Sequence, residues 1–481
     1  MAHLLVSAAH KSSGKTTVSI GLCAALRARG LAVQPFKKGP DYIDPMWLAL
    51  AAGRPCHNLD FHTQGREEIV ALAAARSADA DLALIEGNKG LYDGLDLEGS
   101  NSNAALARLL RAPVVLVLDA RGMTRGIAPL ILGYQAFEPE VDIAGVILNR
   151  LGGSRHEAKL RAVIEHYTDV PVLGAVHQSP ALEIVERHLG LVPSSEHGAA
   201  AERIRAAGEA IAAQVDLDAL LALARRAPPL PAPPPAELPA RPADLTVAVL
   251  RDSAFGFYYQ GDLEALERAG ARLLFLDALR DRRLPDEADA LLIGGGFPET
   301  HMAALEANRE LRGAIREALA GGLPAYAECG GLMYLCRAIR WRGERREMVG
   351  LIPAEAVMCD RPQGRGYVRL AETGEHPWPG AAAGEIAAHE FHYSRLEGLP
   401  AEGLRYAYEV RRGQGIDGRR DGLVLGNTLA CYSHLRDVAA HRWTSRFLDF
   451  VRAVRARRGR PAPAHDEPAE AAPAAARSLE P

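Results

Sequence analysis

Two α/β domains joined by a proline-rich linker are the fold that this sequence predicts. Three observations support it: short apolar runs alternate with helix-like stretches before residue 225, proline crowds the segment 225–244, and the alternation resumes from residue 245. Unbroken apolar runs are typical of parallel strands covered on both faces and joined by crossover helices. A chain of 481 residues is also long enough for two or three domains of ~150 residues.

Strands are expected where the apolar runs stand. In the first domain, residues 1–224, the runs are 4–8, 82–85, 114–118 and 143–148; in the second, residues 245–457, they are 246–250, 273–276, 290–293 and 323–327. Beyond residue 348 glycine and short strand-like pieces such as 367–370 and 404–410 indicate antiparallel hairpins. The tail, 458–481, has no apolar period, and we expect it to be disordered.

The composition excludes several classes of protein. A net charge of -4 gives no electrostatic basis for nucleic-acid binding. No apolar run approaches the ~20 residues of a membrane-spanning helix, and the start lacks the basic region of a secretory signal, so we expect a cytoplasmic protein without a membrane partner. The six cysteines form no CxxC pair, which disfavours a disulfide framework or a thiolate metal site. The oligomeric state is left open between monomer and homodimer.

A phosphate-binding loop follows the first expected strand. Residues 9–17 read AHKSSGKTT, and an apolar-periodic helix is expected over 18–29. In such a loop backbone N–H groups wrap phosphate oxygens, Lys15 reaches the β- and γ-phosphates, and the Thr16 hydroxyl holds Mg²⁺. Ala9 replaces the first glycine of the usual GxxxxGK[ST] pattern, and a plain helix-capping turn is the alternative. The ATP-binding residues expected here are Lys11, Ser13, Gly14, Lys15, Thr16 and Thr17.

Polar residues also stand where other strands should end. FKKGPDYIDP covers residues 36–45, and EGNKGLYDG, residues 86–94, follows the run 82–85. Ligands of open α/β sheets bind beyond the carboxyl ends of strands, and carboxylates there could hold Mg²⁺ together with phosphate oxygens. Each aspartate is equally explained as a turn former. Asn149, after the run 143–148, could contact an adenine edge or cap a helix.

The second domain contains a candidate nucleophile. Residues 323–335, LPAYAECGGLMYL, predict a strand, a sharp turn with Cys329 on it, and a helix. A thiol on such a turn is exposed at the sheet edge, and the start of a helix favours the thiolate. Backbone N–H groups of Gly295 and Gly296, with Gly330 after the thiol, could form an oxyanion hole; a tight turn is the alternative. The other five cysteines are expected to be buried structural thiols.

A thiol nucleophile needs a base, and two groups of histidines qualify. His434 stands late in the domain, and His389 and His392 stand in the HEFHY segment. Spacing alone places neither beside Cys329, because Cys–His sites are assembled from distant segments. We favour His434.

Taken together, these motifs resemble the cobyrinic acid a,c-diamide synthase family. They are GKTT, FKKGPDYIDP, EGNKGLYDG, RDSAFGFYY (251–259), GGGFPE, YAECGGLMYL, HEFHYS and the late His434, in the family's order from the first strand to residue 451. The resemblance implies a P-loop, dethiobiotin-synthetase-like parallel-sheet domain followed by a class I-like glutamine amidotransferase α/β domain. It also implies Mg²⁺ and three small-molecule partners: ATP as co-substrate, L-glutamine and a tetrapyrrole.

The chemistry that the resemblance implies uses two sites. Cys329 forms a glutamyl thioester with His434 as base, and the ammonia passes to the other domain. There ATP·Mg²⁺ phosphorylates the a and c acetates of cobyrinic or hydrogenobyrinic acid, and ammonia displaces phosphate. The resemblance assigns phosphate, metal binding and carboxylate activation to Lys15, Thr16, Lys37, Asp41, Glu86 and Asp93, with Thr16, Asp41 and Glu86 as the metal ligands.

Departures from the family pattern leave alternatives open. Arg436 stands where ordinary class I amidotransferases have a glutamate two residues after the histidine, so another acid, for which Glu390 is a candidate, must orient His434. The segments HLRDV (434–438) and HKSS (10–13) also differ from the commoner versions. The alternatives are amidation of sirohaem in sulfur metabolism, amidation of nickel-sirohydrochlorin, and a non-enzymatic P-loop ATPase switch with an inert amidotransferase domain.

Overall fold

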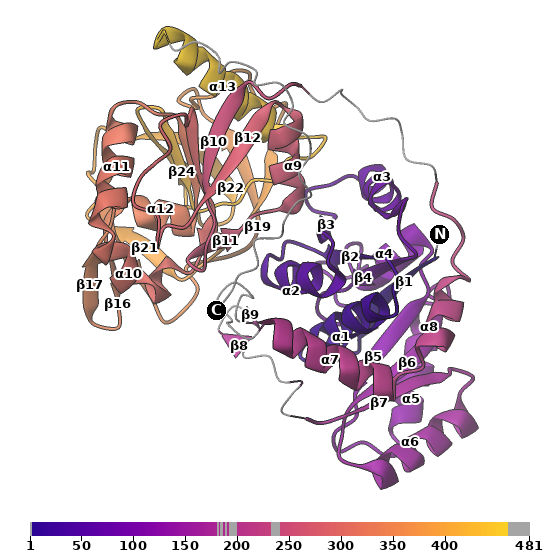
Figure 1. The fold of residues 1–481 in the computed structure, drawn as a ribbon. Coiled ribbons are helices and arrows are strands. Elements are labelled where there is room, and N and C mark those ends of the chain that lie inside the picture. Colours follow the sequence, from indigo (N-terminus) through magenta and orange to yellow (C-terminus); the bar gives the residue numbers. More distant parts are fainter. Residues whose placement is uncertain are drawn as a thin grey trace. The chain divides into compact units, whose positions relative to one another are not determined.

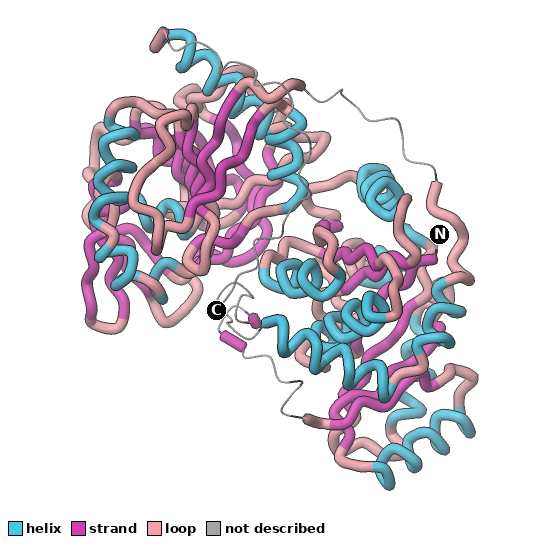
Figure 2. Tube along the Cα trace, viewed as in Figure 1, coloured by secondary structure: helices cyan, strands magenta, loops and turns pink. Residues whose placement is uncertain are grey.

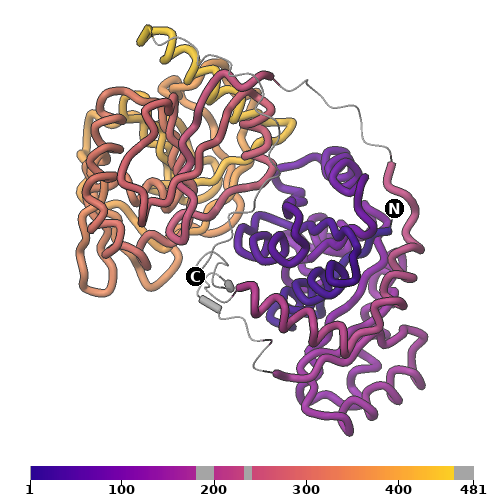
Figure 3. The backbone as a smooth tube through the Cα atoms, viewed as in Figure 1, coloured from indigo at the N-terminus to yellow at the C-terminus, as the bar shows by residue number. Residues whose placement is uncertain are grey.

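The chain divides into two compact units, Met1–Glu237 and Leu238–Pro481. The computed structural model describes residues 2–179, 182, 200–231 and 241–459, and the backbone of residues 186–187 and 190–191. Each unit is built on its own sheet with helices around it, and the chain completes the first unit before it enters the second (Figures 1, 2 and 3). The division falls within the predicted linker. Residues 232–240 of that linker and 460–481 of the predicted tail lie outside the described residues.

The first unit contains a parallel sheet. Its strands are β1 (Ala2–Ala8), β2 (Val33–Lys38), β3 (His57–Leu59), β4 (Leu82–Glu86), β5 (Val114–Asp119), β6 (Ile143–Leu151) and β7 (Val172–His177). In the described part of the chain they form a seven-stranded sheet in the order β3-β2-β4-β1-β5-β6-β7, with every neighbouring pair parallel. The described backbone also contains a short ribbon of β8 (Glu186–Arg187) and β9 (Gly190–Leu191).

Helices cover both faces of this sheet (Figure 1). They are α1 (Lys15–Ala28), α2 (Ile43–Ala52), α3 (Arg66–Ser77), α4 (Asn103–Leu110), α5 (Ile127–Phe137), α6 (Ser154–Tyr167), α7 (Ala200–Gln214) and α8 (Leu217–Ala224). Apolar residues of α3, α4, α5 and α6 share one buried cluster with the strands. On α1, which packs against α2 and α7, a Cβ at Gly21 would stand 2.4 Å from Cγ1 of Ile211, so glycine permits the close approach of α7.

The parallel topology brings distant segments together at one edge of the sheet. The carboxyl ends of parallel strands share an edge, and this is where ligands of open α/β sheets bind. The register places Lys37 of β2 opposite Glu86 of β4, and Asp119 of β5 opposite Asn149 of β6. The loop between β1 and α1 begins at the same edge, in the middle of the sheet.

The second unit is a mixed α/β structure. Its strands are β10 (Leu245–Leu250), β11 (Phe255–Phe257), β12 (Ala271–Leu276), β13 (Ala290–Ile293), β14 (Gly295–Gly296), β15 (Ala325–Glu328), β16 (Cys336–Trp341), β17 (Glu344–Glu347), β18 (Ile352–Met358), β19 (Gly364–Glu372), β20 (Ile386–His392), β21 (Ser394–Glu397), β22 (Arg405–Arg412), β23 (Arg420–Leu425) and β24 (Thr428–Cys431). Among the described residues, nine of them form one sheet in the order β12-β10-β13-β15-β24-β23-β22-β19-β20. The pairs from β12 to β24 are parallel, and those from β24 to β20 are antiparallel, as the sequence predicted for the later half. A smaller sheet, β17-β16-β18-β21, and the ribbon β11-β14 complete the strands.

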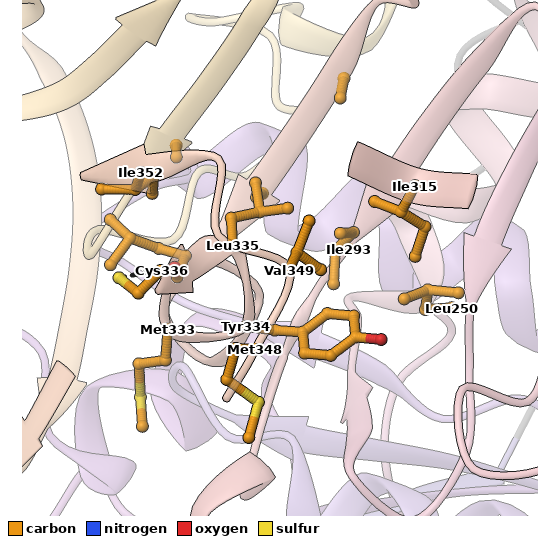
Figure 4. Close-up of a cluster of buried hydrophobic side chains, with 14 of the residues drawn as sticks. Leu250, Ile293, Ile315, Met333, Tyr334, Leu335, Cys336, Met348, Val349 and Ile352 are labelled. Atoms are coloured by element: carbon orange, nitrogen blue, oxygen red, sulfur yellow. Dashed lines mark hydrogen bonds between the residues drawn. The ribbon is translucent and has the colours of Figure 1, made fainter. Parts of the chain in front are cut away.

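The second unit also contains helices, one of which begins directly after the turn that carries the candidate nucleophile. They are α9 (Gln260–Arg268), the 3-10 helix η3 (Pro298–Thr300), α10 (Met302–Ala307), α11 (Arg309–Ala320), α12 (Gly330–Leu335) and α13 (Trp443–Arg457). Around α12, Tyr334 and Leu335 pack in a buried apolar cluster with Ile293 of β13, Ile315 of α11 and Val349 (Figure 4). This packing fixes the helix that follows Cys329. Across the described residues of both units, no helix has the length and apolar character needed to cross a bilayer.

The predicted strands and helices differ from the observed ones mainly at their ends. The strand expected from residue 323 begins at Ala325, because the N–H of Leu323 instead donates to Ala318 at the end of α11, 2.9 Å away. The helix expected from residue 18 begins three residues earlier, at Lys15, because Gly14 adopts a left-handed conformation with φ 84° and caps it. Glycine accepts this conformation without the steric cost that a Cβ imposes.

Gly331→Ala should destabilise the second unit. A Cβ at Gly331 would stand 2.3 Å from the backbone oxygen of Ile293, and a backbone atom cannot move aside cheaply. We expect a loss of about 1–3 kcal/mol in the free energy of unfolding, the usual cost of overpacking. Gly313→Ala in α11 is the control, because nothing lies within 4 Å of its Cβ and alanine should stabilise the helix by about 0.5–1 kcal/mol. Urea unfolding measures both, and equal midpoints for the two variants would contradict this packing.

Candidate functional site

The loop between β1 and α1 is held in shape from β6. Nδ2 of Asn149 donates a hydrogen bond to the carbonyl of Ser13 at 2.8 Å, and Nη1 of Arg150 donates to the carbonyl of Ser12 at 2.7 Å. A Cβ at Gly14 would stand 2.1 Å from Nδ2 of Asn149, so the loop can approach β6 only with glycine here. The contact of Asn149 in this structure is therefore with the phosphate loop, and its contact with adenine stays a prediction.

The predicted ATP-binding residues surround the start of α1. Lys15 is buried, Thr16 and Thr17 are half-buried, and Lys11 is exposed on the loop. Burial and the neighbouring charge of Lys37 lower the pKa of Lys15. An anion such as a nucleotide phosphate would relieve both effects, because it adds the opposite charge to a buried cation.

A cluster of buried charges lies next to Lys15, at the ends of β2 and β4. Nζ of Lys37 lies 2.5 Å from Oδ2 of Asp44, 3.1 Å from Oε1 of Glu86 and 3.9 Å from Oδ2 of Asp41. The hydroxyl of Thr16 donates to Oε1 of Glu86 at 2.6 Å. The structure thus brings together Thr16, Lys37, Asp41 and Glu86, which the sequence analysis selected from three separate segments.

Asp44 is a member of this cluster that the sequence analysis did not select. It lies in the first turn of α2, and its Oδ2 accepts hydrogen bonds from Lys37 at 2.5 Å and from the Thr16 hydroxyl at 3.2 Å. Oδ1 of Asp41 accepts from the backbone N–H groups of Ile43 and Asp44 at 3.0 and 3.1 Å. The signal was the spacing, since an aspartate whose carboxylate accepts from the first N–H groups of a helix lies close to the residue three positions later.

Asp93 has a different environment. Its Oδ2 accepts a hydrogen bond from the backbone N–H of Gly90 at 2.9 Å, which closes a turn in the loop after β4. This is the turn-forming contact that the sequence left open as the alternative for an aspartate. Its role in substrate activation stays a prediction.

Burial and charge oppose each other at the cluster. Burial lowers the pKa of Lys37, but the carboxylates of Asp44 and Glu86 outweigh burial and raise it overall. Burial raises the pKa of Asp44, but the charge of Lys37 outweighs this and lowers it. Burial and the charge of Asp44 raise the pKa of Asp41 to about 7, although the charge of Lys37 and the hydrogen bond from the backbone N–H of Asp44 oppose the rise. The Lys37–Asp44 pair is therefore the ionised centre of the cluster.

The cluster fits a magnesium ion that is shared with a nucleotide. No group of three His, Cys, Asp or Glu side chains among the described residues forms a complete metal site. Mg²⁺ needs less than that, because it takes one or two carboxylates and completes its shell with phosphate oxygens and water. Oε2 of Glu86 is buried and, in the described part of the chain, has no hydrogen-bond partner. Such an oxygen is costly to leave unsatisfied and suits a cation.

In the second unit, Cys329 occupies a strained turn between β15 and α12. Its backbone has φ 47° and ψ -98°. Residues other than glycine rarely adopt this combination, which costs about 1–3 kcal/mol. The same strand–turn–helix geometry exposes the nucleophile of α/β-hydrolases. The N–H of Cys329 donates to the carbonyl of Cys431 on β24 at 2.7 Å. Since β15 and β24 are parallel neighbours, the end of β24 brings the segment 432–434 to the thiol.

His434 is the histidine that reaches the thiol. It forms a side-chain hydrogen bond with Cys329, and its Nδ1 lies 3.2 Å from Oε2 of Glu328. Burial lowers the pKa of His434, but the hydrogen bonds with Cys329 and Glu328 outweigh burial and raise it to about 10. His389 lies beside His434 through backbone pairing, and His392 stacks on Tyr432 with ring centroids 3.8 Å apart. The geometry therefore supports the choice of His434 as base.

The glycines expected at an oxyanion hole lie against this pair. A Cβ at Gly295 would stand 2.6 Å from Cε1 of His434, and a Cβ at Gly330 would stand 2.9 Å from the backbone nitrogen of Gly296. The loop after β13 can therefore close over the Cys329 turn only because these positions have no side chain. Their role in binding an oxyanion stays a prediction.

Two expectations about side chains in this unit were wrong. Glu390 does not substitute for the missing acid, since its carboxylate oxygens accept from the backbone N–H groups of Gln414 and Gly415 at 2.7 and 2.8 Å. The acid beside His434 is Glu328, whose position directly before the nucleophile was the only signal in the sequence. Cys359 is half-buried, whereas Cys23, Cys56, Cys336 and Cys431 are buried as expected.

The two sites define the class of protein, and comparison with known families agrees. Residues 5–192 match the CobQ/CobB/MinD/ParA nucleotide binding domain, and residues 246–438 match the CobB/CobQ-like glutamine amidotransferase domain. A nucleotide-binding domain joined to a glutamine amidotransferase domain makes the chain a glutamine-dependent amidating ligase.

Similarity to individual proteins extends over nearly the whole chain. It is 46% identical to the cobyrinate a,c-diamide synthase of Magnetococcus marinus over 93% of this chain and 97% of that protein. It is 40% identical to the enzyme of the same name from Methanosarcina acetivorans over 95% and 96% of the two chains. The chain belongs to the cobyrinate a,c-diamide synthase family, as its motifs suggested.

A glutamine analogue that carries an electrophilic carbon should label Cys329 selectively. We expect the label on Cys329 because this thiol has a hydrogen bond with His434. Cys359, the half-buried thiol, has no such bond. Peptide mass spectrometry locates the label, and His434→Ala should slow labelling by tenfold or more, about 1.4 kcal/mol in the barrier. Iodoacetamide, which carries no glutamine group, is the control reagent. Preferential labelling of Cys359 by the glutamine analogue would contradict the assignment of the thiol.

Proposed function

We propose that this chain amidates the a and c acetate groups of cobyrinic or hydrogenobyrinic acid, with ATP activating each carboxylate and glutamine supplying the nitrogen. The proposal is carried by one observation: a phosphate loop with a buried lysine–carboxylate cluster and a hydrogen-bonded Cys329–His434 pair occur in one chain. The names of its relatives supply the substrate.

At the thiol, glutamine is converted to glutamate and ammonia. The Cys329 thiolate attacks the amide carbon, and the imidazolium of His434 gives its proton to the leaving nitrogen, so that ammonia departs and a glutamyl thioester remains. Water, deprotonated by the now neutral His434, then attacks the thioester, which releases glutamate and restores the thiolate and the imidazolium. Backbone N–H groups at the glycine loop would stabilise the negative oxygen of the two tetrahedral intermediates.

In the first unit, the carboxylate must acquire a leaving group before ammonia can replace its oxygen. Transfer of the γ-phosphoryl group of ATP gives an acyl phosphate and ADP, and ammonia then forms the amide and releases phosphate. Lys15 and Lys37 place two positive charges where negative charge accumulates on the phosphoryl oxygens. Thr16, Asp44 and Glu86 would hold Mg²⁺; Asp41, which the sequence analysis chose as a metal ligand, is the half-buried carboxylate beside them. Bound there, Mg²⁺ would neutralise phosphate charge.

The alternatives are less well supported. Relatives at 38–46% identity carry the name cobyrinate a,c-diamide synthase, which favours a corrin over sirohaem or nickel-sirohydrochlorin. The Cys329–His434 contact argues against an inert amidotransferase domain that merely accompanies an ATPase switch.

Cys329→Ala should abolish amidation driven by glutamine and leave amidation driven by ammonia intact. The thiol is needed only to release ammonia, whereas the first unit activates the carboxylate. Product formation and ADP release are followed with cobyrinic acid, hydrogenobyrinic acid and sirohaem in parallel, each with glutamine or with ammonium chloride. Turnover of sirohaem alone would overturn the proposed substrate, and equal loss with both nitrogen sources would overturn the division of labour.

Asp44→Asn should lower ADP release with either nitrogen source by about tenfold or more, a change of ~1.4 kcal/mol in the barrier. The substitution keeps the shape of the side chain but removes the charge that pairs with Lys37. Hydrolysis of glutamine at Cys329, measured in the same preparations, reports on folding of the second unit. Asp79→Asn is the control, because Asp79 is an exposed aspartate of the same unit. Wild-type ADP release in Asp44→Asn would show that the cluster does not serve activation.

A further inference from the structure

We propose that Glu328 is a positioning residue that holds the imidazole of His434 toward the Cys329 thiol. It takes the part that ordinary class I amidotransferases give to the glutamate two residues after the histidine, a position that is Arg436 in this chain. The inference rests on the proposed roles of Cys329 and His434, and goes beyond them by naming the acid of the site.

The carboxylate of Glu328 is itself fixed by three contacts. Oε2 faces Nδ1 of His434 at 3.2 Å, and Oε1 accepts hydrogen bonds from the backbone N–H of Leu435 at 2.9 Å and from the hydroxyl of Tyr326 at 2.6 Å. Glu328 and His434 are both buried, at 8% and 3% exposure. A carboxylate that binds both the ring and the backbone of the following residue restrains the position and the rotation of the imidazole.

The contact also selects the nitrogen that serves the thiol. An imidazole has two ring nitrogens, and a carboxylate at Nδ1 favours the proton there. Nε2 is then the nitrogen left for Cys329. This is the arrangement by which an acid orients a histidine in nucleophilic triads.

The strained turn explains how adjacent residues can serve one histidine. Neighbouring residues in a strand point to opposite faces of the sheet. Glu328 is the last residue of β15, and the positive φ of Cys329, 47°, breaks the alternation directly after it. Since β15 pairs in parallel with β24, with Glu328 opposite Cys431, both side chains meet the segment that leaves β24.

Other charged and titratable groups near His434 do not take this part. The His389 ring lies 5.9 Å from the His434 ring, between centroids. Burial raises the pKa values of Tyr258 and Tyr326, which keeps both neutral, and burial also raises that of Asp262. Asp262 accepts from the backbone N–H of Asp437 and from Nε1 of Trp443, at 2.9 and 3.0 Å.

Two more charged groups are engaged elsewhere. Asp421 accepts from the backbone N–H groups of Tyr432 and Ser433, at 3.0 and 2.9 Å, and so fixes the chain before the histidine. The Arg436 guanidinium lies over the Tyr259 ring, 5.1 Å from its centroid. Of these groups, Glu328 is the one with a carboxylate hydrogen bond to the imidazole.

The test is Glu328→Gln in the full chain, with the pH dependence of glutamine hydrolysis as the main readout. The amide keeps the shape and removes the charge, so the imidazolium should lose its proton at lower pH. An opposite charge within ~4–6 Å is worth about 1–3 pH units, and the alkaline limb of the rate should move down by that amount. The turnover number for glutamine should fall on the order of 10²-fold, and alkylation of Cys329 by iodoacetamide at pH 7 should slow.

Three further variants make the result decisive. Glu328→Asp keeps the charge and should restore part of the alkaline shift. Glu390→Gln alters another buried carboxylate of the unit, which accepts from two backbone N–H groups and lies 3.6 Å from Nε2 of His392, not at His434, and it should keep the wild-type pH profile. Tyr326→Phe keeps the Glu328 charge and removes one of the hydrogen bonds that fix its carboxylate, so it should slow glutamine hydrolysis without moving the alkaline limb down, and it serves as the test if Glu328→Gln does not fold.

Two outcomes would overturn the inference. One is a folded Glu328→Gln variant with the wild-type pH profile and alkylation rate. The other is a downward shift produced by Glu390→Gln and not by Glu328→Gln, together with wild-type glutamine hydrolysis in Tyr326→Phe. Because glutamine hydrolysis and alkylation are measured without a corrin, failure of the proposed tetrapyrrole substrate would leave this test intact and would be recognised separately.

Discussion

Parallel pairing of strands is the constraint on which both sites depend. In the first unit β2 and β4 lie side by side, and their common direction places Lys37 opposite Glu86. In the second unit β15 and β24 do the same for Glu328 and Cys431, roughly a hundred residues apart. Antiparallel partners would send these ends to opposite edges of the sheet. The separation in sequence therefore has no bearing on the distance between the groups that act together.

Both sites keep charge out of water, and each does so by pairing. Burial alone disfavours a charged side chain by several kcal/mol, so Lys37 is stable only among its carboxylates, and the imidazolium of His434 only beside Glu328. The two arrangements differ in what they leave unsatisfied. The lysine cluster contains a buried carboxylate oxygen on Glu86 that is ready for a cation, whereas the Glu328 carboxylate already has a donor on each oxygen. The lysine cluster can therefore accept a cation, whereas the Glu328 carboxylate fixes the position of the His434 side chain.

The sequence predicted the fold class, the family and most of the residues of the two clusters, because each follows from local patterns: apolar runs, a glycine–lysine turn, a cysteine between a strand and glycines. It did not predict contacts made across the sheet. Asp44 was missed because a short helix, not a loop, presents it to Lys37. Glu390 was named as a candidate acid and Glu328 was not considered; in a regular strand a residue next to the nucleophile would point away from it. Only the backbone angles of Cys329 reveal the exception.

The backbone angles of Cys329 lower the stability of the fold at the position where the reaction needs a thiol. A residue without a Cβ would relax the turn, and it would have no sulfur with which to attack an amide. Every functional version of this chain must therefore retain a local conformational penalty that the surrounding core compensates for. An inactive descendant would be free to lose it. At position 329, substitutions that increase the stability of the protein therefore remove its activity.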